Sequence, residues 1–129
     1  TTSDLANYAA VQGYEVLTSL DAGDGFWVHA KSAFSVSLPA SPVVSFSTVQ
    51  SGLKSGWNLV SVGETKNASD FTATSVWAWD AARSAWYFYS SELNTSGTLA
   101  NFLQTNNYRS FATDNKTLGL GAGFWVKKP

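Results

Sequence analysis

Residues 75–90 read SVWAWDAARSAWYFYS, in which two runs of aromatic and β-branched residues, 75–80 and 85–90, are joined by a short polar segment. Side chains alternate between the two faces of a strand, so Trp77 and Trp79 share one face of the first run. In the same way Tyr87 and Tyr89 share one face of the second run. The polar segment follows an aspartate, whose carboxylate can accept the backbone N–H groups of a turn. The stretch therefore predicts a β-hairpin with large aromatics on both faces.

On either side of this hairpin, seven further runs are rich in Val, Phe, Trp, Tyr and Thr and are bounded by turn-forming residues. They cover residues 14–20, 25–30, 33–38, 43–49, 57–62, 109–113 and 123–127. Two other segments, residues 3–11 and 96–105, have the apolar spacing of short amphipathic helices. We expect an all-β fold, either an antiparallel β-sandwich or a partly closed barrel, with two short helices.

Two segments near the ends of the chain repeat each other. Leu5-Ala6-Asn7-Tyr8 returns 94 positions later as Leu99-Ala100-Asn101-Phe102, and Gly25-Phe26-Trp27-Val28 returns 98 positions later as Gly123-Phe124-Trp125-Val126. Tyr14 and Leu17 match Tyr108 and Phe111, so a four-residue insertion falls at residues 114–117. Only two copies are present, which is too few for a solenoid. The repeat predicts an internally duplicated half-unit with one helix–strand–strand path in both copies.

The length of 129 residues fits one domain. Pro39 and Pro42 enclose a stiff linker, residues 39–42, because proline cannot continue a central β-ladder. We therefore divide residues 1–129, a single β-sandwich module, into a half-unit at 1–38 and a full unit at 43–129.

Composition narrows the possible partners. The net charge is −1, no cysteine is present, and six tryptophans contribute to an aromatic content of 15%. No basic run is present to bind nucleic acid or an anionic membrane surface, and no apolar run approaches the roughly 18 residues of a membrane span. Absence of cysteine excludes a disulfide scaffold and thiolate metal sites. Such a weakly charged chain suits a module secreted by a bacterium that meets neutral ligands.

Catalytic and metal-binding patterns are weak. His29 is the only histidine, which argues against a histidine metal site or a Ser–His–Asp triad, and the nine acidic residues are scattered. Asp21 and Asp24 offer few of the six to eight oxygens that Ca²⁺ takes, so we assign them to a turn and leave a calcium ion there open. We expect no catalytic residue, no metal and no cofactor, and the chain is interpreted as a non-enzyme.

The second unit resembles an all-β repeat of secreted and surface proteins of bacteria and archaea. The repeat pattern is Gly-Trp-Asn-Leu, Val-Trp-x-Tyr-Asp, Trp-x-x-Tyr and Gly-x-Gly-Phe/Tyr-Trp-Val. It is matched by Gly56-Trp57-Asn58-Leu59, Val76-Trp77-Ala78-Trp79-Asp80, the segment from Trp86 to Tyr89, and Gly121-Ala122-Gly123-Phe124-Trp125-Val126. The match covers roughly residues 53–129, and the first unit has only the second half of the pattern. This resemblance implies an extracellular β-module.

More loosely, the composition is similar to that of carbohydrate-binding modules of plant-polysaccharide-degrading enzymes, since aromatic rings stack on the C–H faces of sugars. We expect a non-catalytic module that binds a neutral plant polysaccharide. The ligand class we favour is a β-glucan: cellulose, mixed-linkage glucan or xyloglucan. We also expect the module to be linked to a catalytic domain. The candidate ligand-binding residues are Trp27, Trp77, Trp79, Tyr87 and Tyr89 for stacking, and Asn58, Asp80 and Gln104 for hydrogen bonds.

Two aromatic residues outside the hairpin are expected to lie in the core. Trp57 and Phe124 each share a strand face with apolar residues, so both are expected to be buried.

The alternative function is a structural or assembly repeat of a bacterial surface or filament protein, in which residues 1–38 pair with a neighbouring chain by strand addition.

Overall fold

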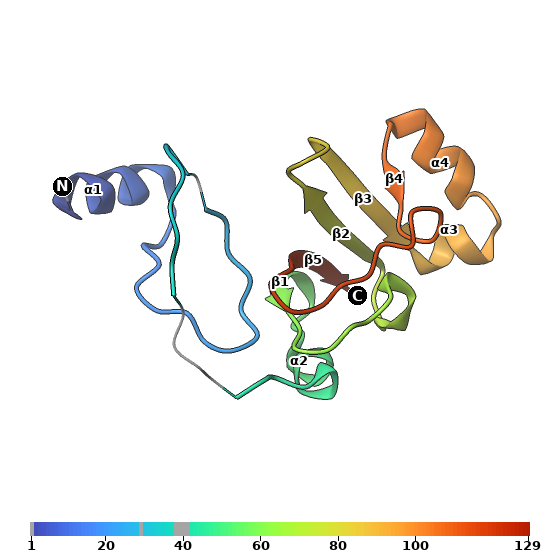
Figure 1. Ribbon diagram of the computed structural model, residues 1–129, viewed down its shortest axis with the longest axis horizontal. Coiled ribbons are helices and arrows are strands. Elements are labelled where there is room, and N and C mark those ends of the chain that lie inside the picture. The colour runs from blue at the N-terminus through green and yellow to red at the C-terminus, as the bar shows by residue number, and fades with distance from the viewer. Residues whose placement is uncertain (1, 29, 38–41) are drawn as a thin grey trace.

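The computed structural model describes residues 2–28, 30–37 and 42–129 (Figure 1). Its helices are α1 (Thr2–Gln12), α2 (Phe46–Gly52), α3 (Ser91–Thr95), α4 (Leu99–Asn106) and a short 3₁₀ helix, η1 (Ala68–Asp70). Its strands are β1 (Gly56–Ser61), β2 (Ser75–Asp80), β3 (Ala85–Ser90), β4 (Arg109–Ser110) and β5 (Gly123–Lys128). None of the helices in this described part is long and apolar enough to cross a bilayer.

The strands form one mixed sheet in the order β1-β5-β2-β3-β4. All neighbours are antiparallel except β3 and β4, which are parallel. The last strand, β5, lies between β1 and β2, and Trp125 is the register partner of Leu59 on one side and of Trp77 on the other. The sheet is open, with β1 and β4 at its edges.

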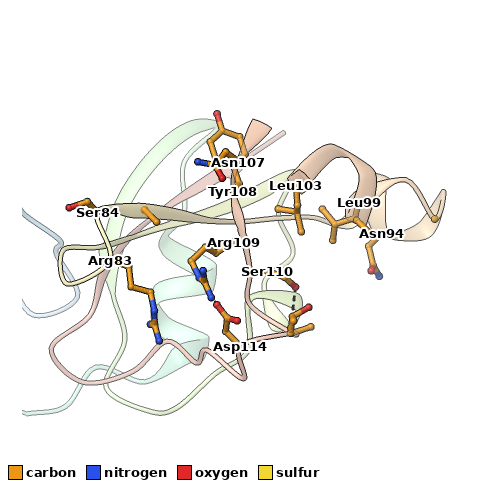
Figure 2. Close-up of a pocket in the computed structure, with 15 residues that line it drawn as sticks. Arg83, Ser84, Asn94, Leu99, Leu103, Asn107, Tyr108, Arg109, Ser110 and Asp114 are labelled. Atoms are coloured by element: carbon orange, nitrogen blue, oxygen red, sulfur yellow. Dashed lines mark hydrogen bonds and ion pairs between the residues drawn. The ribbon is translucent and has the colours of Figure 1, made fainter. Parts of the chain in front are cut away.

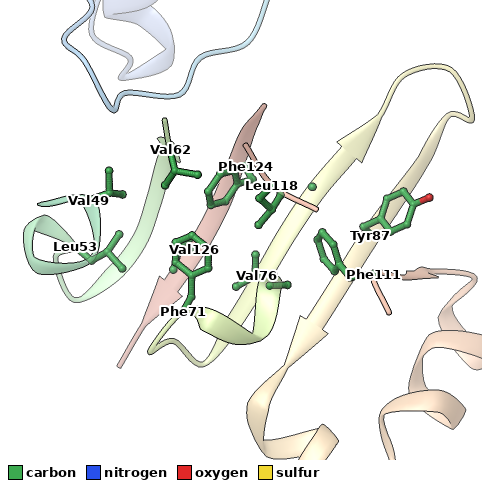
Figure 3. Packing of buried hydrophobic residues seen from close by; sticks show 12 residues of the cluster. Val49, Leu53, Val62, Phe71, Val76, Tyr87, Phe111, Leu118, Phe124 and Val126 are labelled. Atoms are coloured by element: carbon green, nitrogen blue, oxygen red, sulfur yellow. The ribbon is translucent and has the colours of Figure 1, made fainter. Parts of the chain in front are cut away.

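This architecture is mostly β with some helix, and it differs from the expected sandwich or barrel. Among the described residues no second sheet faces the first. One side of the sheet is covered instead by α2, η1 and the chain from residue 111 to residue 118, which supply Val49, Ala68, Phe111 and Leu118 to the core. Figure 3 shows Phe111 and Leu118 beside inward residues of the strands, among them Val76 and Phe124. Phe124 is buried, as the sequence predicted.

The central hairpin is confirmed. β2 and β3 have the bounds that the sequence predicted, and Val76 pairs with Tyr89 across the hairpin. The Asp80 carboxylate accepts the backbone N–H groups of Ala82 at 3.1 Å and Arg83 at 3.2 Å, and it forms a 2.9 Å ion pair with the Arg83 guanidinium. A side-chain hydrogen bond from Arg83 lowers the pKa of Asp80 below its usual value. Asp80 therefore holds the turn.

The remaining strand predictions have mixed outcomes. β1 and β5 are close to their predicted bounds, whereas 109–113 is a strand over Arg109–Ser110 alone. Part of 43–49 is helical, because the Ser45 side chain caps α2 by accepting the Thr48 N–H at 3.2 Å. Residues 14–20, 25–28 and 33–37 are not strands. β-propensity depends on a neighbouring strand to pair with, and here the pairing is limited to an isolated bridge between Asp24 and Val60 of β1. His29 and residues 38–41, most of the predicted linker, lie outside the described residues.

Both predicted helices are present as α1 and α4, although α3 was not foreseen. The segment after α1 contacts the sheet at the free edge of β1. Gly25 N–H donates to Leu59 O at 3.1 Å, and Ser61 N–H donates to Gly23 O at 2.8 Å. A Cβ at Gly25 would lie 2.9 Å from the Val60 backbone, so glycine permits this close approach. α1 itself lies apart from the sheet (Figure 1).

Candidate functional site

All six tryptophans gather on the side of the sheet that faces away from the core. Because Val76 and Ala78 of β2 are buried in the core, alternation places Trp77 and Trp79 on the opposite side. Trp57 of β1, Trp125 of β5 and Trp86 of β3 share that side through the strand register, and Trp27 reaches it from the N-terminal segment. We call these six residues the tryptophan face.

The indole rings contact one another mainly edge to face. Trp57 and Trp125 have ring centroids 6.3 Å apart at an interplanar angle of 84°. Trp86 is the centre of the rest, with centroid distances of 6.2 Å to Trp77, 5.2 Å to Trp79 and 5.8 Å to Trp27. Edge-to-face pairs are a preferred aromatic geometry that stabilises each ring's position. The tryptophan face is thus a set of mutually supported rings.

Four of these rings, those of Trp57, Trp77, Trp86 and Trp125, line an open hollow of about 430 Å³ with no other residue in its wall. A smaller hollow of about 110 Å³ lies beside it, and Trp27, Trp79 and Phe26 contribute to its wall. Ligand sites in proteins are typically concave, mostly apolar and of a few hundred Å³. An exposed apolar patch of this kind marks an interaction surface.

The prediction that Trp57 is buried is wrong, because its side chain is 55% exposed. On β1 the residue that packs against the core is Val60, so the set of Trp57 and Leu59 faces outward. Both alternating sets of β1 contain an apolar residue, and therefore alternation alone did not show which set faces the core.

The two hairpin tyrosines lie on the core side, not on the accessible side. Tyr87 is completely buried, and its hydroxyl donates to the Asp114 carboxylate at 2.7 Å. The Arg109 Nε donates to the same carboxylate at 2.6 Å, and this bond holds the pKa of Asp114 below its usual value. Tyr89 is partly buried and packs against the core. Of the two hairpin sets, Trp77 and Trp79 are the ones that reach the surface.

The three predicted polar contacts are not in the walls of the two hollows. Asn58 Oδ1 accepts the Lys54 N–H at 2.9 Å, and Asn58 Nδ2 donates to the Lys54 carbonyl at 2.8 Å, so this side chain fixes the chain entering β1. Asp80 holds the hairpin turn. Gln104 is exposed on α4.

Trp27 is the predicted residue from outside the hairpin that does reach the tryptophan face, through its contact with Trp86. Trp57, Trp86 and Trp125 were not among the candidate ligand-binding residues. The sequence contained a signal for Trp125, which lies between Phe124 and Val126 and therefore faces outward when Phe124 is buried. Polar neighbours are few, with Lys127 Nζ 5.4 Å from the Trp57 ring and Ser75 Oγ accepting the Trp77 indole N–H at 3.3 Å.

A second, polar cavity of about 760 Å³ lies between the hairpin turn, α4 and β4. Figure 2 shows Arg109 and Asp114 directed toward each other in it, with Arg83 nearby. Arg109 is paired with Asp114, and Arg83 is paired with Asp80. The hydrogen bond that Arg109 donates to Asp114 raises the pKa of Arg109, so both partners stay charged. The charged groups of this cavity are thus held in two ion pairs.

Within residues 2–28, 30–37 and 42–129, no group of three or more His, Asp or Glu side chains is placed to hold a metal ion. The Asp24 carboxylate accepts the Asp21 backbone N–H at 2.9 Å, which is the chemistry of a turn.

No protein-family model, curated protein or solved structure matches the chain.

Proposed function

We propose that the chain is a non-catalytic module that binds a neutral polysaccharide on the tryptophan face. The observation that carries this proposal is the hollow walled by four indole rings and nothing else. Sugar rings present apolar C–H faces that stack on indoles, as nucleobases stack on aromatic side chains. Neither hollow has a charged residue in its described wall, and Lys127 Nζ lies 5.4 Å from the Trp57 ring, so the surface favours an uncharged ligand over an ionic one.

The openness of the face favours an extended ligand. The indoles run from the edge strand β1 through β5 and β2 to β3, so a chain molecule can cross several strands and contact several rings. A β-glucan such as cellulose, mixed-linkage glucan or xyloglucan has sugar rings with broad apolar faces, and it is the ligand class we propose. We further propose that the module is secreted and linked to a catalytic domain, whose effective concentration on its substrate it would raise.

Affinity electrophoresis tests this proposal. Native gels that contain hydroxyethylcellulose, mixed-linkage glucan or xyloglucan should retard the parent chain relative to a gel without polysaccharide. Trp57→Ala should lose the retardation, because Trp57 is exposed and lines the hollow. Leu120→Ala is the matched control, since Leu120 is also exposed and apolar but lies outside both hollows. Equal mobility of the parent chain in all the gels would refute sugar binding.

Assembly is a second candidate function, favoured by a different observation. The N-terminal segment exposes a series of large apolar side chains: Leu5, Tyr8, Val11, Tyr14, Leu17, Leu20, Phe26 and Val28. Most of these occupy the positions of the repeat that has its second copy in residues 99–126. We infer that the two segments are duplicated half-units and that the first one is an assembly surface.

A graft tests the duplication. Residues 99–126 are replaced by residues 5–28, so that the first copy must complete the sheet. The grafted chain should fold cooperatively, although it will be less stable because Tyr87 loses its Asp114 partner. Val28→Asp within the graft should abolish folding, whereas Val28→Asp in the parent chain should be tolerated at its exposed position. A graft that stays unfolded under all conditions would refute the duplication.

A further inference from the structure

The two copies of the repeat have the same local backbone. Tyr14 N–H donates to Ala9 O at 2.8 Å, and at the matching positions Tyr108 N–H donates to Leu103 O at 2.9 Å. Each bond follows a left-handed residue, Gly13 at φ +71° and Asn107 at φ +56°, that ends its helix. These matches fall at the spacing of 94 residues that the sequence repeat requires.

The turn before the last segment of each copy also matches. Asp24 N–H donates to Asp21 O at 3.1 Å, and Ala122 N–H donates to Gly119 O at 3.0 Å. Gly23 at φ +100° and Gly121 at φ +79° occupy the same place in the two turns. The spacing here is 98 residues, so the four-residue insertion lies between two well-matched pieces of backbone.

Burial, in contrast, differs at the positions that face the core in the second copy. Phe26 is 42% exposed where Phe124 is 1% exposed, and Val28 is 57% exposed where Val126 is fully buried. Leu20 is likewise exposed, whereas the matching Leu118 is buried and its backbone pairs with Lys66. The first copy therefore carries the side chains of a core without the strands that would cover them.

The second copy shows which strands these are. β5 is held between β1 and β2, with Val60 opposite Phe124 on one side and Val76 opposite Val126 on the other. A partner for residues 20–28 must therefore supply two strands with a gap between them and a β-branched residue facing inward on each. In this chain that arrangement comes from residues 43–94.

A second copy of the chain is a poor source of such strands. Residues 1–129 contain two segments of the β5 type but one set of β1 and β2. A neighbouring copy could accept residues 20–28 between its β1 and β2 only by expelling its own β5, which would expose Phe124 and Val126. Exchange between copies thus leaves one apolar half-unit uncovered for each chain, whatever the number of copies.

We propose that residues 2–28 are the docking surface for a polypeptide half-unit that has the sequence pattern of residues 43–94 and lies outside this set of 129 residues. The docked partner places one strand on each side of residues 24–28 and buries Phe26 and Val28. In doing so it replaces the hydrogen bonds that Gly23 and Gly25 form with the edge of β1. This proposal rests on the duplication inferred above and is not argued from polysaccharide binding, although Trp27 belongs to both surfaces.

An extended chain tests the partner. A copy of residues 43–94 is fused before Thr1. Its last residue is followed directly by Thr1, just as Asn94 is followed by Thr95 in the parent chain. Hydrogen exchange is then followed at the amides of residues 14–28. The amides of Tyr14, Asp21, Asp24 and Gly25 are already hydrogen-bonded in the parent chain, so the test is read at residues 15–20 and 26–28. These amides should exchange rapidly in the parent chain and slow by about 100-fold in the extended chain, because backbone held in a sheet exchanges only on opening. The matched control carries Val76→Asp in the added copy alone and should give no protection.

Three results would overturn the proposal. Unchanged exchange at residues 15–20 and 26–28 of a soluble extended chain contradicts it, even if the graft of residues 5–28 folds and so preserves the duplication. If these residues become protected in the parent chain as its concentration rises and it dimerises, the site belongs to a second copy. If the extended chain is insoluble, the separately prepared segment 43–94 is mixed with the parent chain, and the absence of protection at residues 15–20 and 26–28 is equally decisive.

Discussion

Residues 2–28 and residues 99–126 share a helix, a left-handed helix end and a turn, but they differ in what surrounds them. In the second segment, Phe124 and Val126 are enclosed by β1, β2 and the loops of the core. In the first segment, Phe26 and Val28 are exposed. Local sequence is thus sufficient for helices and turns, whose hydrogen bonds are formed within a few residues. A strand requires hydrogen bonds from another strand, and its identity depends on what lies beside it.

The largest test of this comparison is a pair of substitutions at matching positions. Phe124→Ala should lower the free energy of unfolding by about 3–5 kcal/mol, because it removes a buried ring and leaves a cavity. Phe26→Ala should cost well under about 1 kcal/mol, in line with substitutions at exposed positions. Urea denaturation measures both, with an unchanged slope as the control for two-state behaviour. Equal losses at the two positions would contradict the difference in burial.

The two segments should behave alike on the tryptophan face, where each contributes one indole. Trp125→Ala and Trp27→Ala should each weaken polysaccharide binding by about 1–3 kcal/mol, the range found for stacked bases. Binding is measured by titration of intrinsic tryptophan fluorescence, and circular dichroism confirms that each variant is folded. Affinity should hardly change with ionic strength, because the ligand is neutral. If Trp27→Ala binds like the parent chain, the first segment has no part in ligand binding.

A smaller effect is expected at the left-handed helix ends. Gly13→Ala should destabilise the end of α1 by about 1–2 kcal/mol, the cost of left-handed backbone for a residue with a Cβ. Space is not the cause, because a Cβ at Gly13 meets no atom within 4 Å. Gly13→Asn should cost less, since asparagine occupies the matching position at Asn107. Amide exchange within α1 measures this local change, and a larger loss for asparagine than for alanine would break the equivalence of the two helix ends.

The smallest effect concerns the insertion, which only the second segment has. Asp114 has a lowered pKa in the folded protein, first because of its hydrogen bond from Arg109 and then because of that from Tyr87. Its stabilising contribution is therefore present above the unfolded pKa of about 4 and is lost as the pH falls through the folded value. Asp114→Asn should have a lower thermal midpoint than the parent chain near neutral pH. The two midpoints should converge in acid. The change should be modest, because the ion pair is partly exposed.

The sequence predicted the elements whose signals are local. β2 and β3 were placed correctly because alternation and the Asp80 turn act within a few residues, and the apolar spacing located α1 and α4. Part of α2 was assigned to a strand although Ser45 offered a helix cap three residues before Thr48. Residues 14–20 and 25–28 have strand-like composition, but no alternation pattern reports whether a partner strand exists.

The candidate site was predicted in part. The aromatic hairpin and Trp27 were identified, and the structure brings Trp77, Trp79 and Trp27 together. Orientation was the weak point, since both faces of the hairpin strands carry aromatics and composition cannot choose between them. Tyr87 is inward because its hydroxyl meets Asp114, a residue 27 positions away that no local pattern connects to it.

The position of β5 also has a consequence for the order of events during synthesis. β5 is the last described strand to leave the ribosome, yet it is the one that joins β1 to β2. Until residues 123–128 emerge, β1 and the β2–β3 hairpin cannot form a continuous sheet, and both keep an unpaired edge open to other chains. Folding must then form contacts between residues as distant as Gly56 and Lys128, and such non-local pairing slows folding. The nascent chain is therefore most prone to aggregation just before β5 is released.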